Sequence, residues 1–315
     1  MSNKIKDKKT VRKILIIVVP IMIAALASMI YFYMQLKKIE VASMPETNQE
    51  LNISDDAASL DKEITNIALL GLDKRSDNET GRSDSIMILS IDRKHNKLKL
   101  LSIMRDTYVN IEGHDMTKIN HAYAYGGENL SIKTLNQNFN LNIKDFVTID
   151  FQEMKSIVNS LGGVEIEIKD YELKSMKAVG ITTPGKYNLN GEQALAYSRI
   201  RYQGNGDYER TERQRTVLMG IFEKIRSQGA LKYPSIASSL LPFVKTSLSP
   251  EEILNIGTYI FTSHINTIEQ VRFPAESYSQ GKMINGVYYL VTDLKATTDQ
   301  INSFIYEENK MSSNK

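Results

Sequence analysis

The feature that most constrains this chain is an uncharged apolar run from Ile14 to Met34. It is about as long as a helix must be to cross a bilayer, and membrane helices tolerate an internal proline such as Pro20. Six basic residues precede it within residues 1–13, against one aspartate. Basic flanks stay on the cytoplasmic side. We therefore expect a cytoplasmic tail over residues 1–13, a single-pass transmembrane helix over residues 14–35, and an extracytoplasmic remainder.

A cleavable signal peptide is the alternative interpretation of this segment, because the triplet from Ala25 to Ala27 resembles a cleavage site. The apolar run continues through Ile30 and Phe32, which makes it longer than an ordinary signal core. An uncleaved anchor in the cell membrane is favoured. The chain has no cysteine, which excludes disulfides and thiolate sites. A net charge of +2 and an external domain do not favour nucleic-acid binding.

The rest of the chain is expected to form one α/β domain. Residues 36–60 are predicted to be a juxtamembrane linker, since residues 41–60 are polar and acidic without a sustained period. The domain is predicted over residues 61–309, and residues 310–315 form a polar tail. Strand and helix patterns alternate, which predicts a central mixed β-sheet flanked by helices. Strands are expected at residues 64–72, 85–91, 97–104, 146–150, 164–168, 270–273 and 287–290. Helices are expected near residues 118–125, 128–139, 151–161, 207–227, 231–241, 251–261 and 292–306.

Residues 199–215 hold five arginines and no lysine, although lysine dominates elsewhere. The planar fork of arginine donors fits phosphate oxygens in pairs, whereas lysine is a point charge. In an extended segment, Arg199 and Arg201 would point to the same side. Asp207 is predicted to be the N-cap of the helix that follows.

On that helix, Arg210 and Gln214 share a stripe with apolar residues, at the end where the dipole favours anions. The alternative is a structural network in which acidic neighbours pair the arginines. Those neighbours are Glu192, Asp207, Glu209 and Glu212.

Acidic and basic residues also stand together at three probable strand ends, where open α/β sheets usually hold ligands. They are Asp73, then Arg82 with Asp84, then Arg105 with Asp106. Salt bridges explain this pattern, and so does a divalent cation beside a pyrophosphate. Magnesium takes one or two carboxylates and completes its shell with phosphate oxygens and water. Both interpretations stay open on spacing alone.

An ordered series of motifs over roughly residues 61–227 resembles the LytR–CpsA–Psr family. The motifs are GLD (71–73), RSDSIMILSID (82–92), LLSIMRDTYVNI (100–111), KINHAYAYGG (118–127), LGGVEIEI (161–168), LNGEQALAYSRIR (189–201) and GDYERTERQR (206–215). The resemblance implies a membrane-anchored extracytoplasmic domain. It also implies transfer of a glycopolymer from a polyprenyl-pyrophosphate carrier onto peptidoglycan.

The resemblance further implies a role for each site residue. Asp73 and Asp84 would bind Mg²⁺ or Mn²⁺, and Asp84 and Arg105 would be catalytic. The pyrophosphate would contact Arg82, Arg105, Arg199, Arg201 and Arg210, with Gln214 nearby. Asp106, Asp207 and Arg213 would support these residues. The chain departs from the family pattern at Met104, where proline is common, and at His121, where a small residue is more usual.

The expected activity is a Mg²⁺-dependent phosphotransferase that releases polyprenyl phosphate and joins teichoic acid or capsular polysaccharide to a peptidoglycan hydroxyl. A polyprenyl-pyrophosphate hydrolase would use the same site with water as acceptor. A non-catalytic wall-binding or regulatory membrane protein would use only the arginines. A groove for the polyprenyl tail is expected on the 207–227 helix, with ordinary helix packing as the alternative. Its candidate residues are Val217, Leu218, Ile221, Phe222 and Ile225.

Overall fold

A six-stranded mixed sheet forms the centre of the computed structural model, which describes residues 34, 41–60, 62–74, 80–201, 206–229, 232–263, 265 and 267–307. The strand order is β10-β3-β2-β1-β6-β9. β1, β2 and β3 form an antiparallel meander. β6 runs parallel to β1, β10 runs parallel to β3, and β9 is antiparallel to β6. The bounds are Ile64–Asp73 (β1), Arg82–Asp92 (β2), Lys97–Ile103 (β3), Asp145–Asp150 (β6), Lys245–Thr246 (β9) and Ile268–Phe273 (β10). The predicted mixed α/β sheet is confirmed.

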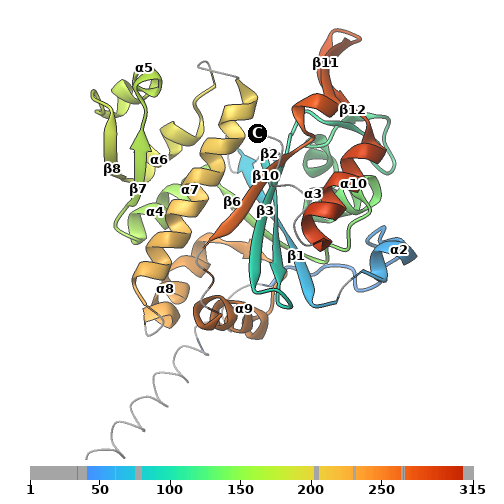
Figure 1. Cartoon of the computed structure of the whole chain (residues 1–315), viewed down its shortest axis with the longest axis horizontal. Helices are drawn as coiled ribbons and strands as arrows, with labels where there is room; N and C mark the ends of the chain where they lie inside the picture. The colour runs from blue at the N-terminus through green and yellow to red at the C-terminus, as the bar shows by residue number, and fades with distance from the viewer. Residues whose placement is uncertain are drawn as a thin grey trace, which may run out of the picture.

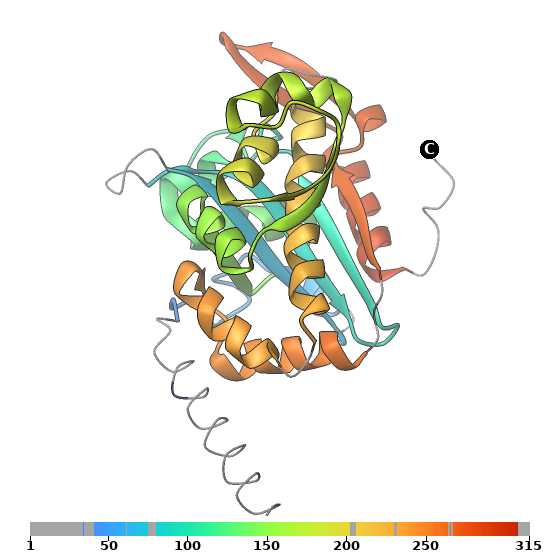
Figure 2. The same cartoon turned by 90° about the vertical axis from the view of Figure 1, so that its left-hand side faces the viewer.

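Helices cover both faces of this sheet, which explains why β1 and β2 are buried along most of their length. On one face lie α2, α3 and α10, and on the other lie α4, α6, α7, α8 and α9 (Figures 1 and 2). The helix bounds are Asp55–Ala58 (α2), His121–Phe139 (α3), Phe151–Ser160 (α4), Leu173–Met176 (α5), Gly191–Ser198 (α6), Asp207–Ser227 (α7), Tyr233–Leu240 (α8), Pro250–Thr262 (α9) and Leu294–Tyr306 (α10).

Local sequence sets several of these boundaries. Asp150 and Glu153 form a capping box that starts α4, and Ser249 with Glu252 does the same for α9. The element α3 consists of two helices that meet at a kink, where the backbone of Gly126 and Gly127 is not helical. Glycine adopts such backbone angles at little cost, and the predicted break between helices at these two residues is confirmed.

Three short two-stranded sheets flank the central one. Four of their strands, β4, β5, β8 and β11, were not predicted, because they are short and mostly polar. The pairs are β4 with β5 (Tyr108–Val109, Thr117–Lys118), β7 with β8 (Val164–Ile168, Gly185–Leu189) and β11 with β12 (Ser279–Ile284, Val287–Thr292).

Residues 41–60 differ from the linker that their polarity predicts. Leu51 and Ala57 are fully buried, and with Ile53 they belong to the core that α3 and α10 share. Val41 forms a parallel bridge to Thr246 beside β9. A few apolar side chains at irregular spacing therefore bring this segment into the domain, ahead of the predicted boundary at residue 61.

The predicted cytoplasmic tail, nearly all of the predicted transmembrane helix and the predicted polar tail lie outside the described residues. Among the residues that the structure does describe, no helix combines the length and the apolar character that crossing a membrane requires.

Candidate pyrophosphate site and its apolar cavities

The predicted charged residues gather where β1 and β3 end, β2 begins and α7 starts (Figure 1). Asp84 of β2 lies at the centre and is 9% exposed. Its Oδ2 accepts a hydrogen bond from Arg105, and the Arg201 guanidinium lies 3.4 Å from the same oxygen. Asn120 donates to Oδ1 at 3.1 Å, and Arg210 donates to the main-chain oxygen of Asp84 at 3.4 Å. Three side chains therefore meet at the Asp84 carboxylate, and a fourth contacts the main chain of the same residue.

Arg105 faces three carboxylates. Besides Asp84, its guanidinium lies 3.5 Å from Asp207 and 3.6 Å from Asp106. Burial lowers the pKa of Arg105, but the three carboxylates outweigh it, and the pKa is raised overall. Asp106 forms its shorter contact with Lys118, at 2.6 Å. Arg105 is therefore permanently charged, and carboxylates on several sides hold its guanidinium in place.

Arg210 is the most deeply buried arginine of the group, at 2% exposure. Its guanidinium donates to Asp207 at 3.0 Å. Burial, together with the neighbouring charges of Arg105 and Arg201, lowers the pKa of Arg210 to about 10, against the opposite effect of Asp207. Cations crowded in this way are stabilised by an additional anion.

The cluster has unused hydrogen-bonding capacity as well as excess charge. Four cationic groups (Arg105, Lys118, Arg201, Arg210) stand against the three carboxylates of Asp84, Asp106 and Asp207, which leaves one positive charge. Among the described residues, the buried Nε atoms of Arg105 and Arg210 have no hydrogen-bond partner, and Arg105 Nε lies 3.6 Å from Asp106. Buried donors without partners are rare in folded proteins. Together with the amino end of α7, they form a site suited to a phosphate-type anion.

Arg199 does not join the group around Asp84. Its backbone is helical, since it caps the end of α6, and its guanidinium lies 4.8 Å from the ring centre of Phe151. The expectation that Arg199 and Arg201 share one side of an extended segment is therefore wrong. The capping box that Asn190 and Gln193 form starts α6 and carries the helix up to Arg199.

The remaining predicted ligands lie at the edge of the cluster. Arg82 is exposed and pairs with Asp73 in the register of β2 and β1. Arg82 also lies near His121, whose pKa is lowered first by burial and then by the charge of Arg82. Gln214, one turn beyond Arg210, lines an apolar cavity described below.

Asp207 is not the N-cap of α7. Gly206 holds that position, with a φ of 61° that suits glycine, and Asp207 is the first helical residue. Its carboxylate instead contacts Arg210 and Arg105. Asp207 thus fixes the orientation of two arginines.

Arg213 belongs to a separate, structural network. It is 3% exposed, and its guanidinium contacts Glu172 at 2.7 Å and Glu209 at 2.6 Å. It also donates to the main-chain oxygen of Ile200 at 3.2 Å. The salt-bridge interpretation is thus correct for this arginine, although its main partner, Glu172, was not among the predicted ones. Through Ile200, Arg213 holds the segment that carries Arg201.

Replacing Arg213 by alanine is expected to lower the free energy of unfolding by about 3–5 kcal/mol, because the buried Glu172 carboxylate would lose its partner. Chemical denaturation measures this change. The double variant Arg213→Met with Glu172→Met is the control, and it should recover much of the loss. An alanine variant as stable as the parent would contradict the network.

Asn120 and Lys118 are site residues for which the sequence predicted no role. Both fall inside the motif KINHAYAYGG, just before α3, and they contact Asp84 and Asp106 respectively. The motif was the available signal. A helix was expected from residue 118 onward, whereas Lys118 ends β5 and Asn120 precedes α3, so the pattern did not show which carboxylate each one contacts.

The predicted metal ligands have different surroundings. Within the described part of the chain, the Asp73 carboxylate takes part in no hydrogen bond or ion pair, whereas that of Asp84 is shared by Arg105, Arg201 and Asn120. The same part of the chain holds no group of three or more acidic or histidine ligands. Two carboxylates and no nitrogen or sulfur donor fit Mg²⁺, which takes the rest of its shell from water and phosphate.

An apolar cavity of about 140 Å³ lies between the sheet and α7, next to the charged cluster. Ser85 and Ser198, the neighbours of Asp84 and Arg199, line it together with Gln214. Val217, Leu218 and Ile221 form its α7 wall, as the predicted lipid groove requires.

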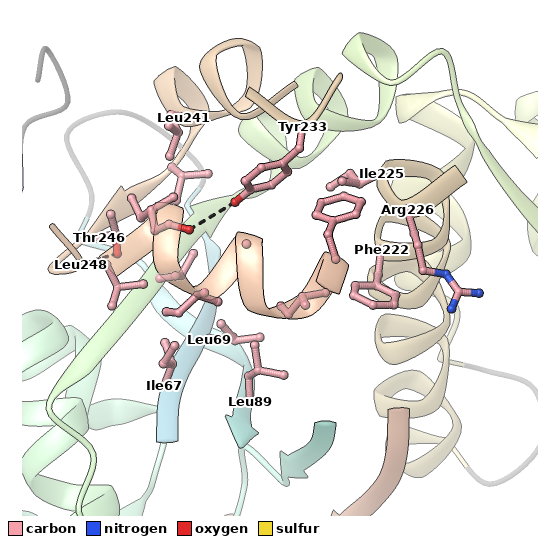
Figure 3. A pocket seen from close by; sticks show the side chains of 17 residues that line it. Ile67, Leu69, Leu89, Phe222, Ile225, Arg226, Tyr233, Leu241, Thr246 and Leu248 are labelled. Atoms are coloured by element: carbon pink, nitrogen blue, oxygen red, sulfur yellow. Dashed lines mark hydrogen bonds between the residues drawn. The ribbon is translucent and has the colours of Figure 1, made fainter. Parts of the chain in front are cut away.

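A second apolar cavity, of about 270 Å³, lies farther from the charged cluster, between the sheet and the helices α7, α8 and α9 (Figure 3). The other two predicted groove residues, Phe222 and Ile225, line it, and the Arg226 guanidinium points away from it. Leu69 and Val147 line both cavities. The two therefore follow one another along the sheet, starting at the charged cluster.

Comparison with known proteins identifies the family. A sequence model of the LytR_cpsA_psr family matches residues 26–304. This chain belongs to the LytR–CpsA–Psr family. Among its relatives, the polyisoprenyl-teichoic acid–peptidoglycan teichoic acid transferase TagU of Enterococcus faecalis is 35% identical over 242 residues, which cover 75% of this chain and 77% of the relative. The polyisoprenyl-teichoic acid–peptidoglycan teichoic acid transferase TagT of Bacillus subtilis is 32% identical over 238 residues, which cover 72% of this chain and 72% of the relative.

A solved structure of a LytR–CpsA–Psr protein, YwtF (TagT) with bound octaprenyl pyrophosphate lipid, has a TM-score of 0.61 and 28% sequence identity. The match covers 78% of this chain and 91% of that one. These comparisons confirm the predicted family, and the names of the relatives confirm the predicted transferase class.

Proposed function

We propose that this LytR–CpsA–Psr protein transfers a glycopolymer from a polyprenyl-pyrophosphate carrier to a hydroxyl group of peptidoglycan. One observation carries the proposal: a cluster of arginines with unused donors lies at the end of an apolar cavity. A polyprenyl diphosphate carries an anionic group, which suits the arginines, next to an apolar chain, which suits the cavity. The named relatives and the neighbour with bound octaprenyl pyrophosphate support the same substrate class.

The diphosphate occupies the space beside Asp84, where Arg105, Arg201 and Arg210 converge. Guanidinium donors then exchange part of their carboxylate contacts for phosphate oxygens, in the paired geometry that arginine favours. The polyprenyl tail lies in the apolar cavities along α7. Each methylene group moved from water into such a cavity contributes about 0.8 kcal/mol.

In the transfer step, an acceptor hydroxyl oxygen forms a bond to the phosphorus that carries the sugar chain. The bond from this phosphorus to the bridging oxygen breaks, and polyprenyl phosphate leaves with the electron pair. Charge builds on the phosphoryl oxygens, where Arg105, Arg201 and Arg210 neutralise it. Asp84, at the centre of the cluster, is our candidate acceptor of the hydroxyl proton.

Magnesium is part of this proposal. Asp73 and Asp84 would hold the ion, and when bound it neutralises negative charge on the diphosphate. The support is the donor set itself, above all a carboxylate at Asp73 that has no partner within the described residues. We also propose that the protein is anchored in the cell membrane by residues 14–35 with its domain outside the cell. This arrangement keeps the site near a lipid-borne substrate.

If Mg²⁺ is required, chelation by EDTA should abolish transfer, and Mg²⁺ or Mn²⁺ should restore it. Asp73→Asn should raise the Mg²⁺ concentration for half-maximal rate by about 10-fold or more, because a neutral amide is a weaker ligand for a hard cation. Glu63→Gln, at a carboxylate just before β1, is the matched control and should behave like the parent. Full activity in EDTA would refute the metal requirement.

The activity itself is tested with the full chain in detergent micelles, a polyprenyl-pyrophosphate-linked glycopolymer and peptidoglycan fragments. Mass spectrometry should detect a phosphodiester between polymer and fragment, formed only when fragments are present. If only free sugar phosphate forms, with or without fragments, the protein is a hydrolase. If the donor binds and no product of either kind forms, the protein is a binding protein.

A further inference from the structure

The hairpin of β11 and β12 is attached directly to the charged site. The main-chain N–H of Leu290 in β12 donates a hydrogen bond to the main-chain oxygen of Asp106 at 2.9 Å, and Leu290 forms a β-bridge with Thr107. The Tyr289 ring lies 4.7 Å from that of Tyr108. These contacts fix the base of the hairpin, while its tip extends beyond the neighbouring elements (Figure 1).

Tyr288 is an exposed aromatic side chain whose position is fixed. Its ring packs across Gly281 of β11, where a Cβ atom would come within 2.7 Å of the ring. The side chain is nevertheless 46% exposed. One side of the ring is thus held against the strand, and the rest is open to solvent. Gly281 pairs with Leu290, so the ring reaches it diagonally across the hairpin, and a ring that covers a strand glycine in this way is ordered by it.

Charged residues of the site surround this ring. The Lys118 Nζ lies 5.9 Å from the ring centres of Tyr288 and Tyr289, and the same atom contacts Asp106 at 2.6 Å. The pKa of Tyr288 is raised by burial and then by Tyr208, Asp106 and Asp207. Tyr288 therefore lies close enough to the site for a ligand at the phosphorus to reach it.

The geometry of phosphoryl transfer distinguishes the two sides of the site. The attacking and leaving oxygens lie roughly in line through the phosphorus. The leaving polyprenyl phosphate points to the cavity under α7, on the side of Ser85 and Gln214. The acceptor must then approach from a side away from the cavity, and Asp106, Lys118 and the hairpin, none of which lines the cavity, form such a side.

We propose that Tyr288 is a stacking platform for a sugar ring of the acceptor glycan strand. This inference rests on the proposed function and adds a subsite to it. An exposed phenol ring offers an apolar face to the C–H groups of a pyranose and a hydroxyl to its polar edge. The platform positions the acceptor hydroxyl and takes no part in the chemistry.

The test measures binding by isothermal titration calorimetry with the full chain in micelles. The probes are a short peptidoglycan glycan strand without cross-links and, separately, a polyprenyl diphosphate that carries no sugar. Tyr288→Ala should weaken glycan binding by about 5- to 10-fold and leave diphosphate binding unchanged. Tyr288→Phe keeps the ring and should bind the glycan like the parent. Val287→Ala, an exposed apolar residue on the opposite face of β12, is the matched control.

Two results would overturn the platform: glycan binding that Tyr288→Ala leaves unchanged, or a parent protein that binds no glycan strand. If Tyr288→Ala weakens binding of a sugar-bearing donor and spares the glycan strand, the ring serves the donor, and the proposal is equally wrong. Should the alanine variant fail to fold, Tyr288→Leu covers Gly281 without an aromatic face and gives the same comparison. Binding is measured without turnover. If the protein binds the glycan strand through Tyr288 but shows no transfer, the result counts against the proposed function and not against the stacking role of Tyr288.

Discussion

Arg105→Ala is expected to lower the transfer rate by about 10²–10³-fold, the usual loss when one preorganised contact to transition-state charge is removed. Arg105 contacts Asp84 and lies within 3.6 Å of Asp106 and Asp207, so its fork is fixed before substrate binds. The variant leaves three carboxylates facing the diphosphate without their shared counter-charge. Single-turnover kinetics with saturating donor measure this effect on the chemical step.

Two controls separate catalysis from folding in this experiment. Arg105→Lys keeps the charge and loses the fork, so it should recover only part of the rate. Chemical denaturation shows whether either variant unfolds under assay conditions. A folded alanine variant with a rate within about 3-fold of the parent would mean that Arg105 makes no contact specific to the transition state.

Leu218→Trp is expected to weaken binding of a long-chain donor by about 10²-fold. Leu218 lines the cavity of about 140 Å³ beside the charged cluster, and the larger indole would occupy part of that space. Excluding roughly three or four carbon atoms of the polyprenyl chain costs about 3 kcal/mol at ~0.8 kcal/mol for each buried methylene group, which corresponds to about 10²-fold in affinity. Titration with polyprenyl diphosphates of several chain lengths measures the loss.

The decisive observation for Leu218→Trp is how the loss of affinity depends on the length of the prenyl chain. A donor whose prenyl chain is too short to reach Leu218 should bind the variant and the parent equally. Met219→Trp adds the same side chain at the next position of α7, which does not line the cavity, and should leave long-chain binding unchanged. An equal loss for short and long chains would indicate distortion of α7 and would contradict a lipid-binding cavity.

Periodic patterns made the core of this fold predictable. β1 and β2 are buried along most of their length because helices cover both faces of the sheet, and capping boxes start α4 and α9. The convergence of Asp84, Arg105 and Arg201 was implied by the resemblance to the LytR–CpsA–Psr family, because spacing alone left salt bridges as an equal explanation. Pairing of strands far apart in sequence leaves no periodic signal, so the actual contacts needed the structure.

Other features carried weak or misleading signals. Arg199 was expected in an extended segment, but the capping box before α6 makes its backbone helical and sends its side chain to Phe151. The hairpin strand β11 is largely exposed and lacks apolar alternation, so it was not predicted. Glu172 pairs with Arg213 across 41 positions of sequence, a distance at which no local pattern connects two charges.

The most direct test of the central claim is a crystal structure of the protein with a polyprenyl diphosphate. We predict phosphate oxygens within hydrogen-bond distance of Arg105, Arg201 and Arg210, beside Asp84, with the prenyl chain lying between the sheet and α7 against Val217, Leu218 and Ile221. A diphosphate bound elsewhere, with these arginines still paired only to their carboxylates and the cavity closed to the lipid, would contradict the account.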